Sequence, residues 1–136
     1  PVLTYYGAGD RKHVFRNRLY VTENRGDSTR NTKGQALFNE YQYQQPLQLK
    51  WAKKTILTAG LVHLYNFVNS GPLYGIKDSR NVAVYVQADQ NIGKFNYSVG
   101  LRYESFVINR EAPIQYPVAR LGVNYQLFKA SWLRAS

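Results

Sequence analysis

Residues 81–107 constrain the fold of this chain more than any other stretch. They read NVAVYVQADQNIGKFNYSVGLRYESFV, two runs of alternating apolar and polar side chains joined by Asn-Ile-Gly-Lys at residues 91–94. Asn and Gly accept the positive φ that a tight hairpin turn requires. Successive side chains of a strand point to opposite faces. The stretch therefore predicts a long antiparallel hairpin with one apolar and one polar face.

The length of the two runs indicates which solvent meets the apolar face. Alternation extends over about 11 residues in the first arm and about 14 in the second. Strands of soluble proteins usually have roughly 5 to 6 residues, whereas a tilted strand needs about 9 to 11 to cross a bilayer. The hairpin thus favours a membrane strand pair, although a sandwich core or a lipocalin-like barrel also accepts such alternation.

The same alternation predicts strands along the rest of the chain, over residues 13–22, 34–51, 55–67, 117–127 and 130–136, with the end of a further strand within residues 1–12. The expected connections alternate long and short, at residues 23–33, 52–54, 68–79, 92–93, 108–115 and 128–129. Outer-membrane barrels have long external loops and short periplasmic turns in this order. The last strand stops at residue 136, and Pro1 is not a natural start, so we expect a chain that is mature, processed or cut from a longer one.

Charged residues are sorted between the two predicted faces. From residue 34 onward the apolar faces carry no Asp, Glu, Lys or Arg, and the opposite faces carry Glu40, Asp89, Arg102, Glu104, Arg120 and Arg134. An Arg or Lys facing lipid at mid-depth costs roughly 2 to 4 kcal/mol, so a membrane strand requires such sorting. The segment 55–67 fits least well, since Ile56, Val62, Leu64 and Gly60 fall on the face that should be polar.

Three stretches follow one another in a characteristic order: KTILTAGLVHLYNF, then NVAVYVQADQNIGKFNYSVGLRYESF, then PVARLGVNYQLFKASWLRAS. Their Gly-bearing strand, aromatic strand near Gln-Ala-Asp, "GLRYE" strand and "LRAS" strand resemble the barrel of TonB-dependent outer-membrane receptors. The resemblance covers roughly residues 34–136. It implies that residues 1–136 form a segment of a transmembrane β-barrel of about 22 strands, represented here by about seven to eight, with the plug domain absent.

The resemblance also implies a function. Such a receptor lies in the bacterial outer membrane and takes up a scarce nutrient, such as a ferric siderophore, with energy from an inner-membrane complex that it contacts through the missing plug. Its other partners would be the nutrient itself and outer-membrane lipid, including lipopolysaccharide. The residues expected to face a ligand are Arg102, Glu104 and Arg120 on the polar face and Lys77, Arg80 and Arg110 in the presumed outer loops.

Signatures of catalysis and of metal or cofactor binding are missing from the sequence. Cys is absent, and the two histidines, His13 and His63, each fall on an apolar face without a second ligand at metal spacing. No Gly-rich phosphate loop, nucleophile elbow or paired-carboxylate arrangement occurs. We therefore expect no enzyme activity, no catalytic residue, no metal and no cofactor.

A formal net charge of +10 suggests three kinds of environment: solvated loops, an anionic lipid or ligand, or nucleic acid. Nucleic-acid binding needs aromatic and basic side chains on one exposed face. Tyr97, Tyr103 and Tyr125 instead lie opposite Arg102 and Arg120, so nucleic acid is not an expected partner. Two alternatives to the receptor segment remain: a small self-contained outer-membrane barrel with a structural or adhesive role, and a soluble basic all-β binding module.

Overall fold

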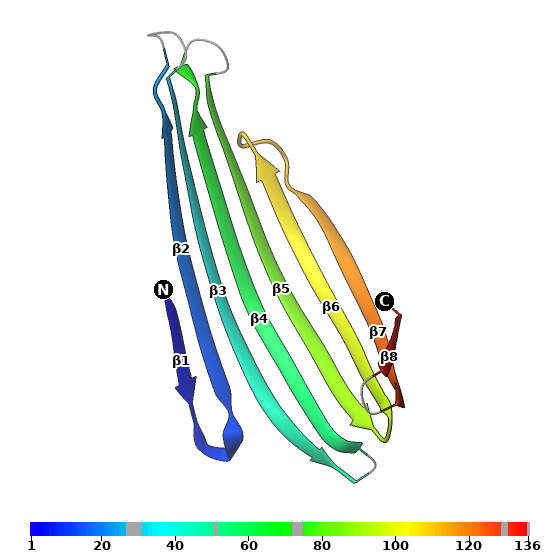
Figure 1. Ribbon diagram of the computed structural model, residues 1–136. Helices are drawn as coiled ribbons and strands as arrows, with labels where there is room; N and C mark the ends of the chain where they lie inside the picture. The colour runs from blue at the N-terminus through cyan, green and yellow to red at the C-terminus, as the bar shows by residue number, and fades with distance from the viewer. Residues whose placement is uncertain (27–30, 51, 72–74, 129–130, 136) are drawn as a thin grey trace.

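The computed structural model describes residues 1–26, 31–50, 52–71, 75–128 and 131–135. Nearly all of them lie in one antiparallel β-sheet (Figure 1). The strands are β1 Val2–Tyr6, β2 Lys12–Asn24, β3 Thr32–Leu49, β4 Ala52–Asn69, β5 Ile76–Ile92, β6 Phe95–Ile108, β7 Ile114–Phe128 and β8 Ser131–Ala135. A short 3-10 helix, η1 Ala8–Asp10, joins β1 to β2. The predicted all-β, antiparallel, up-and-down meander is confirmed, and the sheet has eight strands.

The predicted hairpin is the pair β5 and β6. Ile92 at the end of β5 pairs with Phe95 at the start of β6, and the turn lies at Gly93 and Lys94. Gly93 has a φ of 62°, the left-handed conformation that Gly adopts without steric cost. The β5 strand has 17 residues, and β6 has 14. The length of β6 agrees with the predicted length of about 14 residues. The predicted length of β5, about 11 residues, was too short, because residues 76–80 also belong to the strand.

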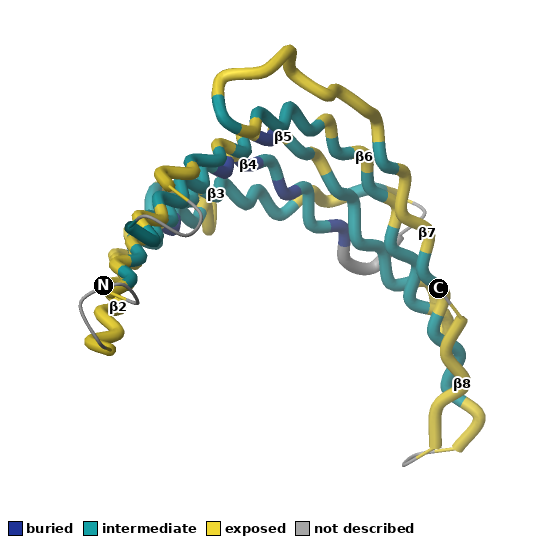
Figure 2. Tube along the Cα trace, turned by 90° about the horizontal axis from the view of Figure 1, so that it is seen from above, coloured by how far each residue is buried: buried dark blue, intermediate teal, exposed yellow. Residues whose placement is uncertain are grey.

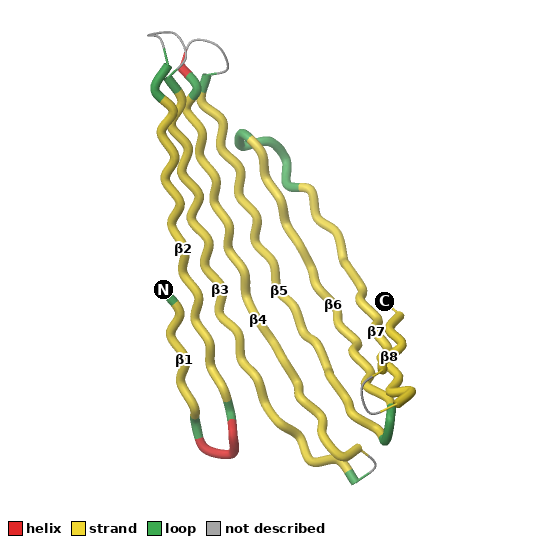
Figure 3. The backbone as a smooth tube through the Cα atoms, viewed as in Figure 1, coloured by secondary structure: helices red, strands yellow, loops and turns green. Residues whose placement is uncertain are grey.

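The alternation of longer and shorter connections is confirmed, but the predicted boundaries were wrong at several places. The longer loops join β2 to β3, β4 to β5 and β6 to β7, and the strand ends that they join lie at one end of the sheet (Figure 3). The shorter turns, of two residues each, join β3 to β4, β5 to β6 and β7 to β8 at the other end. The β1–β2 connection at that end has five residues and departs from the alternation. The sequence predicts loops for polar residues at the strand ends, because apolar and polar side chains alternate only weakly there. In the structure these residues pair across strands, as Lys33 does with Asn69. For the same reason β4 begins at Ala52, where a turn was predicted. Residue 129 of the predicted last turn and residue 130, the predicted start of the last strand, lie outside the described residues.

The sheet is curved and open. Seen from above, it forms an arch with β2 and β8 near its two ends (Figure 2). Within the described residues β1 pairs only with β2, and β8 only with β7, so the two outer strands do not close the sheet into a barrel.

The pairing register sorts the side chains onto two faces, named here by what they carry. The apolar face contains Val84, Leu101 and Leu121, which are 47%, 60% and 69% exposed. The polar face contains Glu40, Tyr85 and Arg102, which are less exposed than these three residues of the apolar face. The few buried residues of the polar face, among them Val62 and Ala83, form the small core of this structure.

Charge sorting between these faces is confirmed for the segments in which it was predicted. The register places Glu40, Asp89, Arg102, Glu104, Arg120 and Arg134 together on the polar face. On the described part of the apolar face, the charged side chains are Glu23, Lys33, Asp78 and Arg80, all near the end of the sheet that carries the longer loops. Below them the apolar face of β5 runs from Val82 to Ile92 without a charge.

Candidate functional site

A chain of polar contacts links four strands across the polar face. Tyr85 of β5 extends over Gly60 of β4, where a Cβ atom would overlap its ring. Its hydroxyl donates a 2.9 Å hydrogen bond to Oε1 of Glu40 on β3. Oε2 of the same carboxylate forms an ion pair of 2.7 Å with Arg16 of β2, and that Arg also donates to Gln42 at 3.1 Å. Gly60 therefore leaves the space through which β5 reaches β3.

A second polar group lies on β5, β6 and β7. Nε of Arg102 contacts Oε1 of Glu104 as an ion pair, without the angle of a hydrogen bond. Oε2 of Glu104 accepts hydrogen bonds from the side chains of Asn81 at 3.3 Å and Tyr116 at 3.2 Å. Each charge of the pair is thus balanced by a neighbour, which favours a structural role for Arg102 and Glu104.

A hollow of about 250 Å³ lies between the two groups and is lined by Glu40, Tyr85, Arg102 and Arg120 together with neighbouring residues of β3 and β5–β7. Arg120 of β7 is exposed, and within the described residues it forms no ion pair. The hollow therefore offers one available guanidinium beside hydrogen-bonding groups that are already engaged. Such a surface suits a hydrated, anionic solute better than an apolar one.

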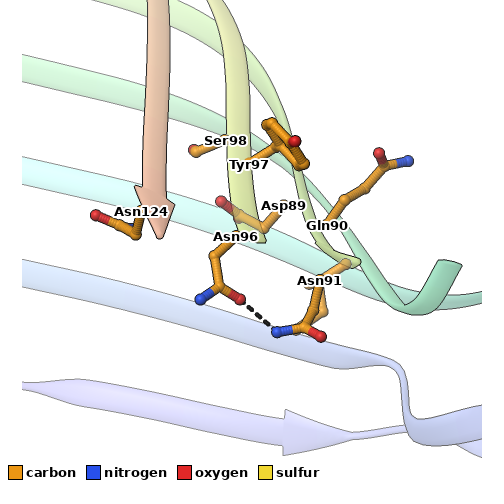
Figure 4. A pocket seen from close by; sticks show the side chains of 8 residues that line it. Asp89, Gln90, Asn91, Asn96, Tyr97, Ser98 and Asn124 are labelled. Atoms are coloured by element: carbon orange, nitrogen blue, oxygen red, sulfur yellow. Dashed lines mark hydrogen bonds between the residues drawn. The ribbon is translucent and has the colours of Figure 1, made fainter. Parts of the chain in front are cut away.

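Another hollow, of about 360 Å³, lies near the shorter turns (Figure 4). The side chains of Asn91 and Asn96 point toward one another there and form a hydrogen bond. Asp89 accepts two hydrogen bonds from Gln87, at 2.9 and 3.0 Å. Because these polar groups satisfy each other, the hollow resembles a hydrated surface more than a specific binding site.

The six predicted ligand-facing residues do not form one group. Arg102, Glu104 and Arg120 lie on the polar face, and Lys77 lies on the same face near the longer loops. Arg80 lies on the apolar face, and Arg110 in the β6–β7 connection lines a hollow with it. Lys77 and Arg80 belong to β5 and not to a loop, which corrects the prediction.

Sequence reasoning placed Glu40 on the polar face but did not connect it with Arg16 and Tyr85. These contacts span β2, β3 and β5, so they depend on registers that alternation within one strand does not determine. Gly60 was the available signal: a small residue on a face of large polar side chains indicates close approach by a neighbour.

Two further findings concern the described residues as a whole. They contain no group of three or more His, Cys, Asp or Glu side chains arranged to hold a metal ion. No helix among them has the length and apolar character needed to cross a membrane.

Comparisons with known proteins give no match to this chain, either among protein-family models, among curated proteins or among solved structures. The function proposed below therefore depends on the sequence, the fold and the two faces of the sheet.

Proposed function

We propose that this chain is part of an outer-membrane β-barrel, with the apolar face toward lipid and the polar face toward a water-filled interior. The observation that carries the proposal is the distribution of charge and exposure between the faces. Val84, Leu101 and Leu121 are exposed on a face whose charges lie only near the longer loops, among the described residues. In a soluble protein an apolar surface of this extent would need a covering partner.

Strand length and connectivity support the same proposal. Strands β2 to β7 have between 13 and 18 residues, more than the roughly 9 to 11 that a tilted strand needs to cross a bilayer. The excess length places the strand ends beyond the hydrocarbon, where Lys33 and Arg80 are tolerated. From β2 onward the longer loops lie at one end and the shorter turns at the other, as in outer-membrane barrels.

Within this class we propose a segment of a TonB-dependent receptor, which moves a scarce nutrient such as a ferric siderophore inward with energy from an inner-membrane complex. The support is the sequence resemblance over residues 34–136 and the open arch of the sheet. A small barrel made only of these eight strands would pair β1 with β8. The hollow with Arg120 supplies a cation for an anionic nutrient.

Fractionation and uptake together test this function. In cells that make the full protein, we expect it in the outer membrane, and we expect deletion to abolish uptake of one nutrient that is scarce in the medium. Uptake should also stop when a protonophore removes the inner-membrane proton gradient, because no energy source exists in the outer membrane. Energy-independent uptake would contradict the receptor proposal, and recovery of the protein in the soluble fraction would contradict the membrane proposal.

A further inference from the structure

A hollow of about 370 Å³ lies on the apolar face near the longer loops. Arg80 of β5 and Arg110 of the β6–β7 connection line it together with Tyr65, Phe67 and Val107. The Arg80 guanidinium carbon lies 5.9 Å from the centre of the Tyr65 ring, so the cation stacks against an aromatic wall. Two guanidinium groups thus lie at the charged border of the apolar face, next to the uncharged part that begins at Val82.

The backbone holds Arg110 in an unusual conformation. Asn109 and Arg110 have φ values of 47° and 63°, in the left-handed region that favours Gly. Two hydrogen bonds fix this turn to β5: the amide of Asn109 donates to the carbonyl of Asp78 at 2.8 Å, and the amide of Asp78 donates to Oδ1 of Asn109 at 3.1 Å. Gly would adopt this turn more easily than Arg, so the conformation of the turn does not account for an Arg at position 110.

The charges around the hollow leave both guanidinium groups available. Within the described residues neither Arg80 nor Arg110 forms an ion pair. Asp78 also lines the hollow and reduces its net positive charge to one. Lys33, on the same face of β3, lies 3.4 Å from Glu23 and is already paired. A phosphate group entering the hollow would therefore meet two unpaired donors that have the planar geometry for phosphate binding.

We propose that Arg80 and Arg110 bind a phosphate of an anionic lipid headgroup in the outer leaflet of the membrane. This inference rests on the proposed function, because it requires the apolar face to meet lipid. The hollow is continuous with that face through Val107 and Val82, so acyl chains can lie below the headgroup. Tyr65 and Phe67 supply the aromatic surface typical of the membrane–water interface.

Lipid retention in nanodiscs tests the site in the full protein. The probe is lipid A, a glycolipid with two phosphates, mixed into phosphatidylcholine, and bound lipid is measured by native mass spectrometry. Arg80→Gln removes one cation, and Arg110→Gly removes the other while introducing the residue that the turn prefers. We expect each variant to lower lipid A affinity about fivefold, the loss that corresponds to one charge contact near an anionic membrane. Asp78→Asn should raise the affinity.

Lys77→Gln is the matched control, because it removes a neighbouring cation on the opposite face of β5. Its lipid A affinity should remain that of the unmodified protein, and inorganic phosphate at the same concentration should not displace the lipid. Equal affinity in Arg80→Gln, Arg110→Gly and Lys77→Gln would overturn the site, and displacement by free phosphate would overturn the lipid assignment. A spin label at Val84 in the same nanodiscs reports contact with acyl chains, so failure of the site and failure of the membrane proposal are distinguishable.

Discussion

Tyr85 occupies the space above Gly60 on the adjacent strand, in the volume that any side chain at position 60 would fill. The ring crosses the whole of β4, and its hydroxyl reaches Glu40 on β3. Strands that are not neighbours are thereby joined on the polar face, and Arg16 extends the connection to β2. This arrangement strengthens a sheet that has few buried residues elsewhere.

Gly60→Ala should destabilise the protein, because the new methyl group overlaps the Tyr85 ring. We expect a loss of about 1 to 3 kcal/mol in the free energy of unfolding, as for other overpacked sites. The measurement is urea unfolding of the full protein in lipid vesicles. Gly100→Ala is the matched control, since a Cβ there would lie 3.5 Å from the nearest atom, in ordinary contact. Equal stability of the two variants would show that the ring does not lie above Gly60.

Tyr85→Phe should keep the ring in place and remove only its hydrogen bond to Glu40. A hydrogen bond to a carboxylate contributes more than one between neutral groups, so we expect a loss of about 1 to 2 kcal/mol in unfolding free energy. In a Glu40→Gln background the same change should have a smaller effect. A double-mutant cycle with no coupling between the two positions would contradict the contact.

Glu104→Gln should destabilise the protein by about 1 to 2 kcal/mol, because it leaves the partly enclosed Arg102 without its counter-charge. Arg120→Gln removes an exposed cation on the same face and should change stability by less than about 0.5 kcal/mol. For nutrient uptake we expect the reverse: Arg120→Gln should reduce uptake more than Glu104→Gln does. If Arg120→Gln leaves uptake unchanged, the ligand does not contact this guanidinium.

Leu101→Arg should impair insertion into the membrane, because it places a cation on the face that we propose meets lipid. The cost for a mid-depth position is roughly 2 to 4 kcal/mol, measured as the unfolding free energy in vesicles. Ser98→Arg on the same strand faces the other way, opposite Asp89, and should be tolerated. Equal tolerance of the two substitutions would argue against lipid on the apolar face.

Alternation within single stretches was sufficient to predict the strands, the β5–β6 hairpin and the two faces. It failed at strand ends such as residues 76–80, where backbone pairing with β4 continues although four of the five side chains are polar. The wrong position of Arg80 followed from that error: an outer loop was predicted, but the register of β5 places Arg80 on the apolar face. Arg110 lies in the β6–β7 connection, as predicted. The contact of Tyr85 with Glu40 depends on how β3, β4 and β5 are aligned with one another, and the pattern within a single strand does not determine that alignment.

The central claim is that acyl chains contact one face of this sheet and water the other. A spin label attached to a single introduced Cys tests this claim. Residues 1–136 contain no Cys, and any Cys elsewhere in the full protein is replaced first. The label is placed at Val84 and Leu101 on the apolar face and at Gln87 and Ser98 on the polar face. At each position the collision rate of the label with oxygen, which concentrates in lipid, is compared with its collision rate with a water-soluble nickel chelate. The proposal predicts that oxygen dominates at the first pair and the nickel chelate at the second. Equal access of the nickel chelate to all four positions would contradict it.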